Sequence, residues 1–112
     1  MKLADIEAII AEYEKHGWRL RRVILTEELQ TTLGRDVAVF QQTEVVSSDL
    51  DAAWFSRVSG PHKETWELRR LASAPFAIDA FLSDEASSEE NEDILRNTET
   101  RMRGFSPSDA GH

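Results

Sequence analysis

Residues 52–71 decide the fold, because they contain two alternating stretches of apolar and polar side chains around a turn; their sequence is AAWFSRVSGPHKETWELRRL. Alternation of this kind is typical of β-strands that bury one face. Gly60 and Pro61 stand between the two stretches, and this pair favours a turn because glycine permits a positive φ and proline fixes its own φ. The sequence therefore predicts an antiparallel β-hairpin in the middle of the chain.

The two stretches also predict a register for this hairpin. We expect the cross-strand pairs Val58–Glu64, Ser56–Trp66 and Trp54–Leu68. This register gives the sheet one face that is rich in aromatic and aliphatic side chains. The opposite face then carries Phe55, Arg57, Glu67 and Arg69, and Arg57 and Glu67 become diagonal neighbours of opposite charge.

The residues before the hairpin predict a helix, a strand and a short second helix. Apolar side chains recur at helical spacing over residues 4–16, and Gly17 favours the end of a helix. Residues 18–25 alternate as in a strand, with Trp18, Leu20 and Ile24 on one face, although Arg22 interrupts that face. Thr26 is a suitable N-cap for a helix that ends at Gly34.

Two further segments complete the expected sheet. Residues 37–40 favour a short buried strand because valine and phenylalanine suit a pleated surface, although Asp36 could instead cap a helical turn. Residues 76–82 predict another strand, with Phe76, Ile78, Ala80 and Leu82 on one face.

The last quarter of the chain differs from the rest in charge. Residues 1–82 hold 10 basic and 13 acidic side chains, whereas residues 83–112 hold 3 and 8. A serine cap at Ser87, acids in the next turn and arginines near residue 103 predict a helix over residues 88–103. Residues 106–112 have the composition of a disordered end.

The apolar face of this C-terminal helix is thin, since it consists of Ile94, Leu95 and Met102. An isolated helix of this length is marginally stable in water, so we expect it to dock weakly or to become ordered on a partner. We divide the chain into one α+β domain at 1–82 and an acidic helical appendage at 83–112. The expected fold is an N-terminal helix packed on a small antiparallel sheet with a central hairpin, followed by this charged helix or tail.

The sequence lacks the residues or spacings that several classes of chemistry require. The chain of 112 residues contains no cysteine, and its three histidines are far apart in elements that do not activate a nucleophile. Its glycines are isolated and form no phosphate-binding loop, and the acids at 84–93 lack the spacing of a calcium loop. We therefore expect no catalytic residue, no cofactor and no metal site, although enzymatic activity stays open.

The sequence also indicates where the protein acts. No apolar run exceeds four residues, so we expect no direct membrane insertion, and the acids near Met1 are unlike a signal peptide. These features predict a cytoplasmic location. The formal net charge of −8 disfavours nucleic acid as a partner, because a phosphate-binding protein benefits from a positive field.

Arginines on the first strand and on the hairpin predict an arginine-rich sheet face that docks acidic protein segments. The candidate partner-binding residues are Arg19, Arg21, Arg57, Arg69 and Phe55 on the sheet, with Ile94, Leu95 and Met102 in the tail. The function expected is a non-catalytic interaction module, such as an accessory subunit or adaptor, with a homo-oligomer left open. The alternatives are a domain that binds an anionic ligand, or acts on it as an enzyme, in an arginine-lined pocket, and an acidic decoy of a nucleic-acid-binding protein.

Overall fold

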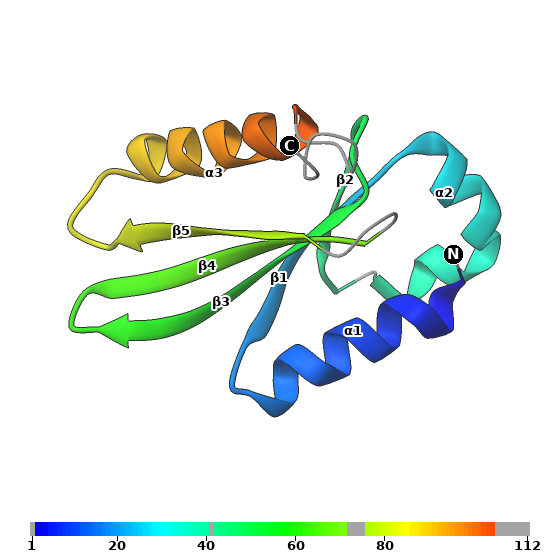
Figure 1. Ribbon diagram of the computed structural model, residues 1–112, viewed down its shortest axis with the longest axis horizontal. Helices are drawn as coiled ribbons and strands as arrows, with labels where there is room; N and C mark the ends of the chain where they lie inside the picture. The colour runs from blue at the N-terminus through cyan, green and yellow to red at the C-terminus, as the bar shows by residue number, and fades with distance from the viewer. Residues whose placement is uncertain (1, 41, 72–75, 105–112) are drawn as a thin grey trace, which may run out of the picture.

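The computed structural model describes residues 2–40, 42–71 and 76–104, and it has a five-stranded sheet with helices on both faces (Figure 1). In chain order, the elements are α1 (Leu3–Lys15), β1 (Arg19–Leu25), α2 (Glu27–Leu33), the 3₁₀ helix η1 (Gly34–Phe40), β2 (Glu44–Ser47), β3 (Ala52–Gly60), β4 (Lys63–Arg70), β5 (Ala77–Ser83) and α3 (Ser88–Arg103). The α+β class and the N-terminal helix expected from the sequence are confirmed.

The sheet is mixed, which corrects the expectation of an antiparallel sheet. Its strand order is β2-β1-β3-β4-β5, and β1 and β2 run parallel, whereas all other neighbouring strands are antiparallel. Parallel neighbours need a crossover connection, and α2 and η1 supply it. Strand β2 lies at one edge of the sheet and β5 at the other.

Strands β3 and β4 form a hairpin in which Trp54 lies opposite Leu68, Ser56 opposite Trp66 and Val58 opposite Glu64. These are the pairs expected from the sequence. The turn consists of residues 61 and 62, and the residue with a positive φ is His62 (60°) and not Gly60, for which the Gly-Pro pair predicts it. Proline fixes the first turn position, so the residue after it turns the chain back.

A bulge in β1 changes the side-chain alternation that the sequence predicts. Leu20 lies opposite Phe55 and Arg22 lies opposite Trp54, so Arg21 is the extra residue between two regular pairs. The alternation reverses at this point, and Ile24 shares a face with Arg22 and not with Leu20. The expectation that Leu20 and Ile24 share one face is therefore wrong.

The two faces of the sheet carry separate apolar clusters. The cluster beneath α1 and α2 consists of Ile6, Val23, Leu25, Leu29, Leu33, Phe40, Ala53, Phe55 and Leu71. The cluster beneath α3 consists of Ile24, Leu50, Ala52, Trp54, Trp66, Leu68, Ala80, Leu82, Leu95 and Met102. In Figure 1, α1 and α3 lie on opposite sides of the sheet.

Residues 37–40 lie in η1, so the strand expected there is wrong and the helical alternative suggested by Asp36 is closer to the structure. Gly34 has a positive φ of 54°, a value that starts the new turn directly after α2. The 3₁₀ conformation buries Phe40 in the cluster beneath α1 and leaves Val39 exposed.

Helix α3 begins after Ser87, whose hydroxyl accepts a hydrogen bond of 3.1 Å from the backbone N–H of Glu90. Its narrow apolar face packs on the sheet, where Leu95 is 2% exposed and Met102 is fully buried. This packing joins α3 to the core around the tryptophans of β3 and β4. Whether residues 1–82 fold alone stays a prediction, and the end expected to be disordered, 106–112, lies outside the described residues.

Candidate functional site

The structure does not bring the predicted partner-binding residues together on one surface. Phe55, Leu95 and Met102 are buried in the two clusters, so they cannot contact a partner without unfolding of their surroundings. Phe55 is buried because α1 covers the face that carries it, and Leu95 and Met102 are buried because the apolar side of α3 packs on the sheet; neither docking is visible in the sequence. Ile94, by contrast, is exposed on α3.

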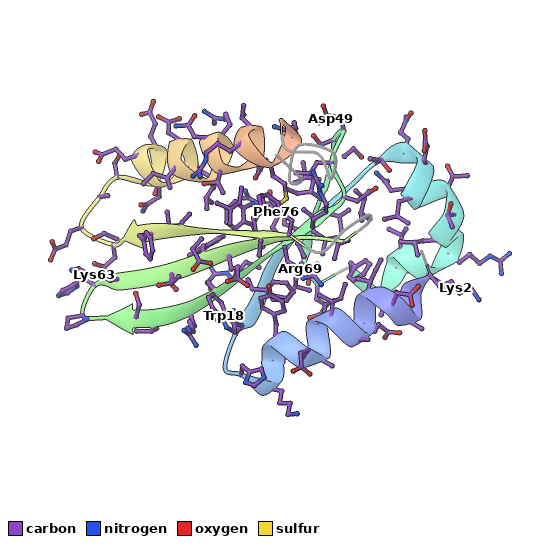
Figure 2. All side chains as sticks on the ribbon, viewed as in Figure 1. Lys2, Trp18, Asp49, Lys63, Arg69 and Phe76 are labelled. Atoms are coloured by element: carbon purple, nitrogen blue, oxygen red, sulfur yellow. The ribbon has the colours of Figure 1, made fainter. Side chains whose placement is uncertain are left out.

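The four candidate arginines are also divided between the faces. Arg57 and Arg69 share one face with Phe55, as predicted, and this face is the α1 side; Arg69 is near the centre of the view in Figure 2. Arg21 lies on the α3 side, where its guanidinium is 4.9 Å from the centre of the Trp66 ring. Arg19 is exposed and lies opposite Ser56 in the sheet. The bulge at Arg21 prevents the single arginine-rich face that the sequence predicts.

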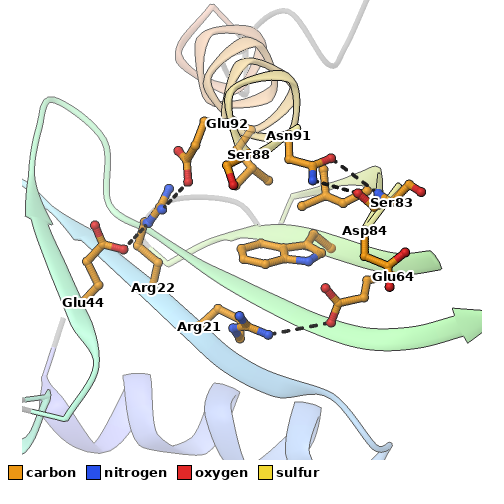
Figure 3. Close-up of a pocket in the computed structure, with 12 residues that line it drawn as sticks. Arg21, Arg22, Glu44, Glu64, Ser83, Asp84, Ser88, Asn91 and Glu92 are labelled. Atoms are coloured by element: carbon orange, nitrogen blue, oxygen red, sulfur yellow. Dashed lines mark hydrogen bonds and ion pairs between the residues drawn. The ribbon is translucent and has the colours of Figure 1, made fainter. Parts of the chain in front are cut away.

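A cleft of about 360 Å³ lies on the α3 side, between α3 and the sheet (Figure 3). Strands β1, β2 and β4 supply the charged side chains Arg21, Arg22, Glu44 and Glu64. The segment from β5 to the start of α3 supplies Ser83, Asp84, Ser88, Asn91 and Glu92, and the apolar lining is Trp66, Leu82 and Leu95.

Arg22 links three elements at one end of this cleft. Its Nε donates to Glu44 Oε2 at 2.8 Å, and its Nη2 donates to Glu92 Oε1 at 3.0 Å. A third carboxylate, that of Glu99, lies 3.9 Å from Nη1 and also accepts a 2.8 Å hydrogen bond from Trp54 Nε1. Burial would lower the pKa of Arg22, but the hydrogen bonds to Glu44 and Glu92 outweigh it and raise the pKa. Arg22 is therefore a positively charged connector between β1, β2 and α3.

Arg21 and Trp66 form the floor of the cleft. Arg21 donates to Ser56 Oγ at 3.3 Å, and its guanidinium is 3.7 Å from the carboxylate of Glu64. The Nε1 atom of Trp66 is buried and has no hydrogen-bond partner among the described residues. Two arginines and four carboxylates line the cleft, and both arginines already contact carboxylates, so its electrostatics disfavour an anionic ligand.

A second surface lies on the α1 side of the sheet, beyond the area that α1 covers. We call it the open face and define it by Trp18, Arg57, Thr65, Glu67, Asp79 and Phe81. Of the described helices, α3 makes the main contact with β5, from the other side of the sheet, and Phe81 is 71% exposed on this side. The Arg57 guanidinium is 4.5 Å from the centre of the Trp18 ring, which Figure 2 shows beside α1.

Tyr13 on α1 fixes the inner border of the open face. Its ring stacks on Phe55 with centroids 4.0 Å apart and meets Trp18 edge to face at 5.9 Å. Its hydroxyl donates a short hydrogen bond to Glu67 Oε2. These contacts hold the indole of Trp18 in place between α1 and the sheet, with part of its surface exposed.

Two carboxylates face each other next to this tyrosine. Glu67 on β4 lies opposite Asp79 on β5. Burial raises the pKa of the Glu67 carboxyl, and the hydrogen-bonded carboxyl of Asp79 raises it further. Burial and the hydrogen bond to Glu67 raise the pKa of the Tyr13 hydroxyl as well. Glu67 therefore retains its proton to a higher pH than an ordinary glutamate does.

The open face was only partly foreseeable. The alternation in residues 76–82 already separates Phe81 from the buried side chains of that strand, and this signal identifies an exposed aromatic. The contacts that Tyr13 and Trp18 make with Phe55 and Arg57 carry no sequence signal, because they depend on where α1 packs.

Two further findings concern the described residues as a set. They contain no group of three or more histidine, aspartate or glutamate side chains arranged to hold a metal ion. None of the helices in this part of the chain has both the length and the apolar composition needed to cross a membrane.

Comparisons with protein families, with curated proteins and with solved structures find no match to this chain.

Proposed function

We propose that this chain is a non-catalytic protein-interaction module, such as an accessory subunit or adaptor, and that it binds its partner through the open face. The proposal includes the cytoplasmic location expected from the sequence. The observation that carries it is the exposed Phe81 on a sheet surface that also presents the stacked pair Arg57 and Trp18. Aromatic and arginine side chains are enriched at the energetic centres of protein interfaces.

The rigidity of this surface supports the proposal. Arg57 rests on the Trp18 ring, and Trp18 is held by Tyr13, so little side-chain freedom remains to be lost on binding. A side chain on a regular strand is also better fixed than one on a loop. The open face therefore offers a partner a preorganised aromatic and cationic contact.

The charges of the open face indicate what the partner presents. Arg57 is exposed and stacks on an aromatic ring, so its charge is available to a carboxylate from outside. Phe81 offers an apolar contact on the same face two strands away, because Thr65 of β4 lies opposite both Arg57 of β3 and Phe81 of β5. An acidic segment that also carries an apolar side chain would satisfy both groups.

The experiment compares two charge reversals in affinity purification from the native host. Arg57→Glu reverses the charge on the open face, whereas Arg96→Glu makes the same change at an exposed position of α3, on the other side of the sheet. We expect a specific partner to be captured by the wild type and by Arg96→Glu and to be lost with Arg57→Glu. Equal capture by both variants would remove the open face from the proposal.

A further inference from the structure

Strand β5 forms an unprotected edge of the sheet. An edge strand presents unpaired backbone groups, and proteins usually blunt such edges with lysine, proline or a covering segment. β5 has the sequence AIDAFLS, with one charged residue and neither lysine nor proline. Its neighbour on one side is β4, and it has no strand on the other side in the described sheet.

The free backbone groups of β5 can be assigned from the ladder. The backbone N–H of Arg70 donates to the C=O of Phe76, so the even-numbered residues of this segment pair with β4. The N–H and C=O groups of Ala77, Asp79, Phe81 and Ser83 therefore point away from the sheet. Asn91 of α3 already occupies the last of these positions, because its amide exchanges two hydrogen bonds with the backbone of Ser83.

Helix α3 lies close to the same edge, and its ion pairs fix its rotation about its own axis. Glu92 and Glu99 reach Arg22 of β1, and Arg103 reaches Asp49 after β2, so this side of α3 faces the far edge of the sheet. The helical period then places four other residues on the side next to the free edge of β5. These residues are Glu90, Ile94, Asn97 and Arg101, and Ile94 is 37% exposed.

This outer side of α3 is complementary to itself. It is acidic at Glu90, apolar at Ile94 and basic at Arg101, so two such helices placed antiparallel would set each acid against the arginine of the other. No hydrogen bond or ion pair is found for the guanidinium of Arg101 in the part of the chain that the structure describes. The charge pattern is therefore one that a second copy of the chain would satisfy.

One twofold axis can pair the two β5 edges and the two α3 helices at the same time. Asn91 lies at Ser83, and the carbonyl of Met102 accepts from Arg70 near the other end of β5, so the middle of α3 lies over Ala80. A twofold axis beside Ala80 pairs Asp79 with Phe81 of the second copy and brings the two α3 helices antiparallel. Because α3 packs on both β5 and β4, the helices come about two strand spacings apart, roughly 10 Å, at which helices pack.

We propose that this chain forms a twofold homodimer through the β5 edge and the outer side of α3, which makes a continuous ten-stranded sheet with Glu90 of each copy against Arg101 of the other. This interface places Asp79 and Phe81, at the β5 edge of the open face, beside the second copy, and it does not involve the Arg57–Trp18 pair of β3 and the β1 start. The test uses the isolated chain, so its outcome is independent of whether the open face binds another protein.

The experiment measures the dimer dissociation constant by sedimentation velocity over a range of chain concentrations. Symmetry repeats the Glu90–Arg101 contact, so Arg101→Glu or Glu90→Arg alone should weaken the dimer about tenfold or more. The double variant with both reversals should restore the dimer, because it exchanges the two charges. Arg96→Glu makes the same charge change away from this interface and should leave the dissociation constant unaltered.

Two results would overturn the proposal. The first is a wild-type chain that sediments as a monomer at every concentration up to several hundred micromolar. The second is a dimer that Arg101→Glu and Glu90→Arg leave intact, or that the double variant fails to restore although circular dichroism shows it to be folded. Weakening of the wild-type dimer at high salt would agree with the charged contact.

Discussion

Replacement of Leu95 by alanine tests whether α3 is part of the core. Leu95 is 2% exposed and packs in the cluster that contains Trp54 and Trp66. Truncation of a buried leucine removes its transfer free energy and leaves a cavity, so we expect the free energy of unfolding to fall by about 3 kcal/mol. Urea denaturation followed by tryptophan fluorescence should show the midpoint lowered by about 1–3 M.

Ile94 supplies the matched control, because it is the adjacent residue and lies on the exposed side of the same helix. Ile94→Ala should change the free energy of unfolding by less than about 1 kcal/mol when the chain is dilute enough to be monomeric. If Leu95→Ala and Ile94→Ala have equal midpoints, α3 does not pack on the sheet, and the appendage expected from the sequence is the better description.

Three further predictions follow from the described contacts. The pKa of Glu67 is raised in the folded state, so its protonated carboxyl contributes to the free energy of unfolding fully below the ordinary pKa of 4.5. This contribution is lost as the pH rises through the folded pKa. A series of urea midpoints across pH 4–8 should therefore fall for the wild type, and Glu67→Gln should remove this fall. Arg22→Ala should lower the free energy of unfolding by about 2 kcal/mol, because Glu99 loses a partly buried charged partner, whereas Arg96→Ala should change it by less than about 0.5 kcal/mol in the same assay. Trp66→Ala should cost about 3–5 kcal/mol, and a melting temperature equal to that of wild type would show that this face of the hairpin is not core.

Local signals account for the elements that sequence reasoning predicts best. The hairpin register follows from alternation and from a turn pair, and the limits of α3 follow from Ser87 and from the distribution of its charges. Both features depend on residues that are close in sequence, so they can be predicted from the sequence alone. The exposure of Phe81 can also be predicted from local sequence, since it follows from alternation along β5.

The features that the sequence does not reveal depend on distant contacts. The bulge at Arg21 is defined only by how β1 pairs with β3. Because of this bulge, Arg21 lies on the α3 side of the sheet, whereas Arg57 lies on the α1 side. Strand β2 is a four-residue segment that exists because β1 offers it a parallel partner. The burial of Met102 likewise requires the tryptophan cluster beneath α3, which a helix considered in isolation does not show.

Hydroxyl-radical footprinting of the complex isolated from the native host tests the proposed interaction surface most directly. Trp18 and Phe81 should be labelled in the free chain at a concentration where it is monomeric and protected in the complex, because both contribute to the open face. Val58 is 77% exposed and faces the other side of the sheet, so its labelling should stay unchanged. Protection of Val58 with unchanged labelling of Trp18 and Phe81 would contradict the account.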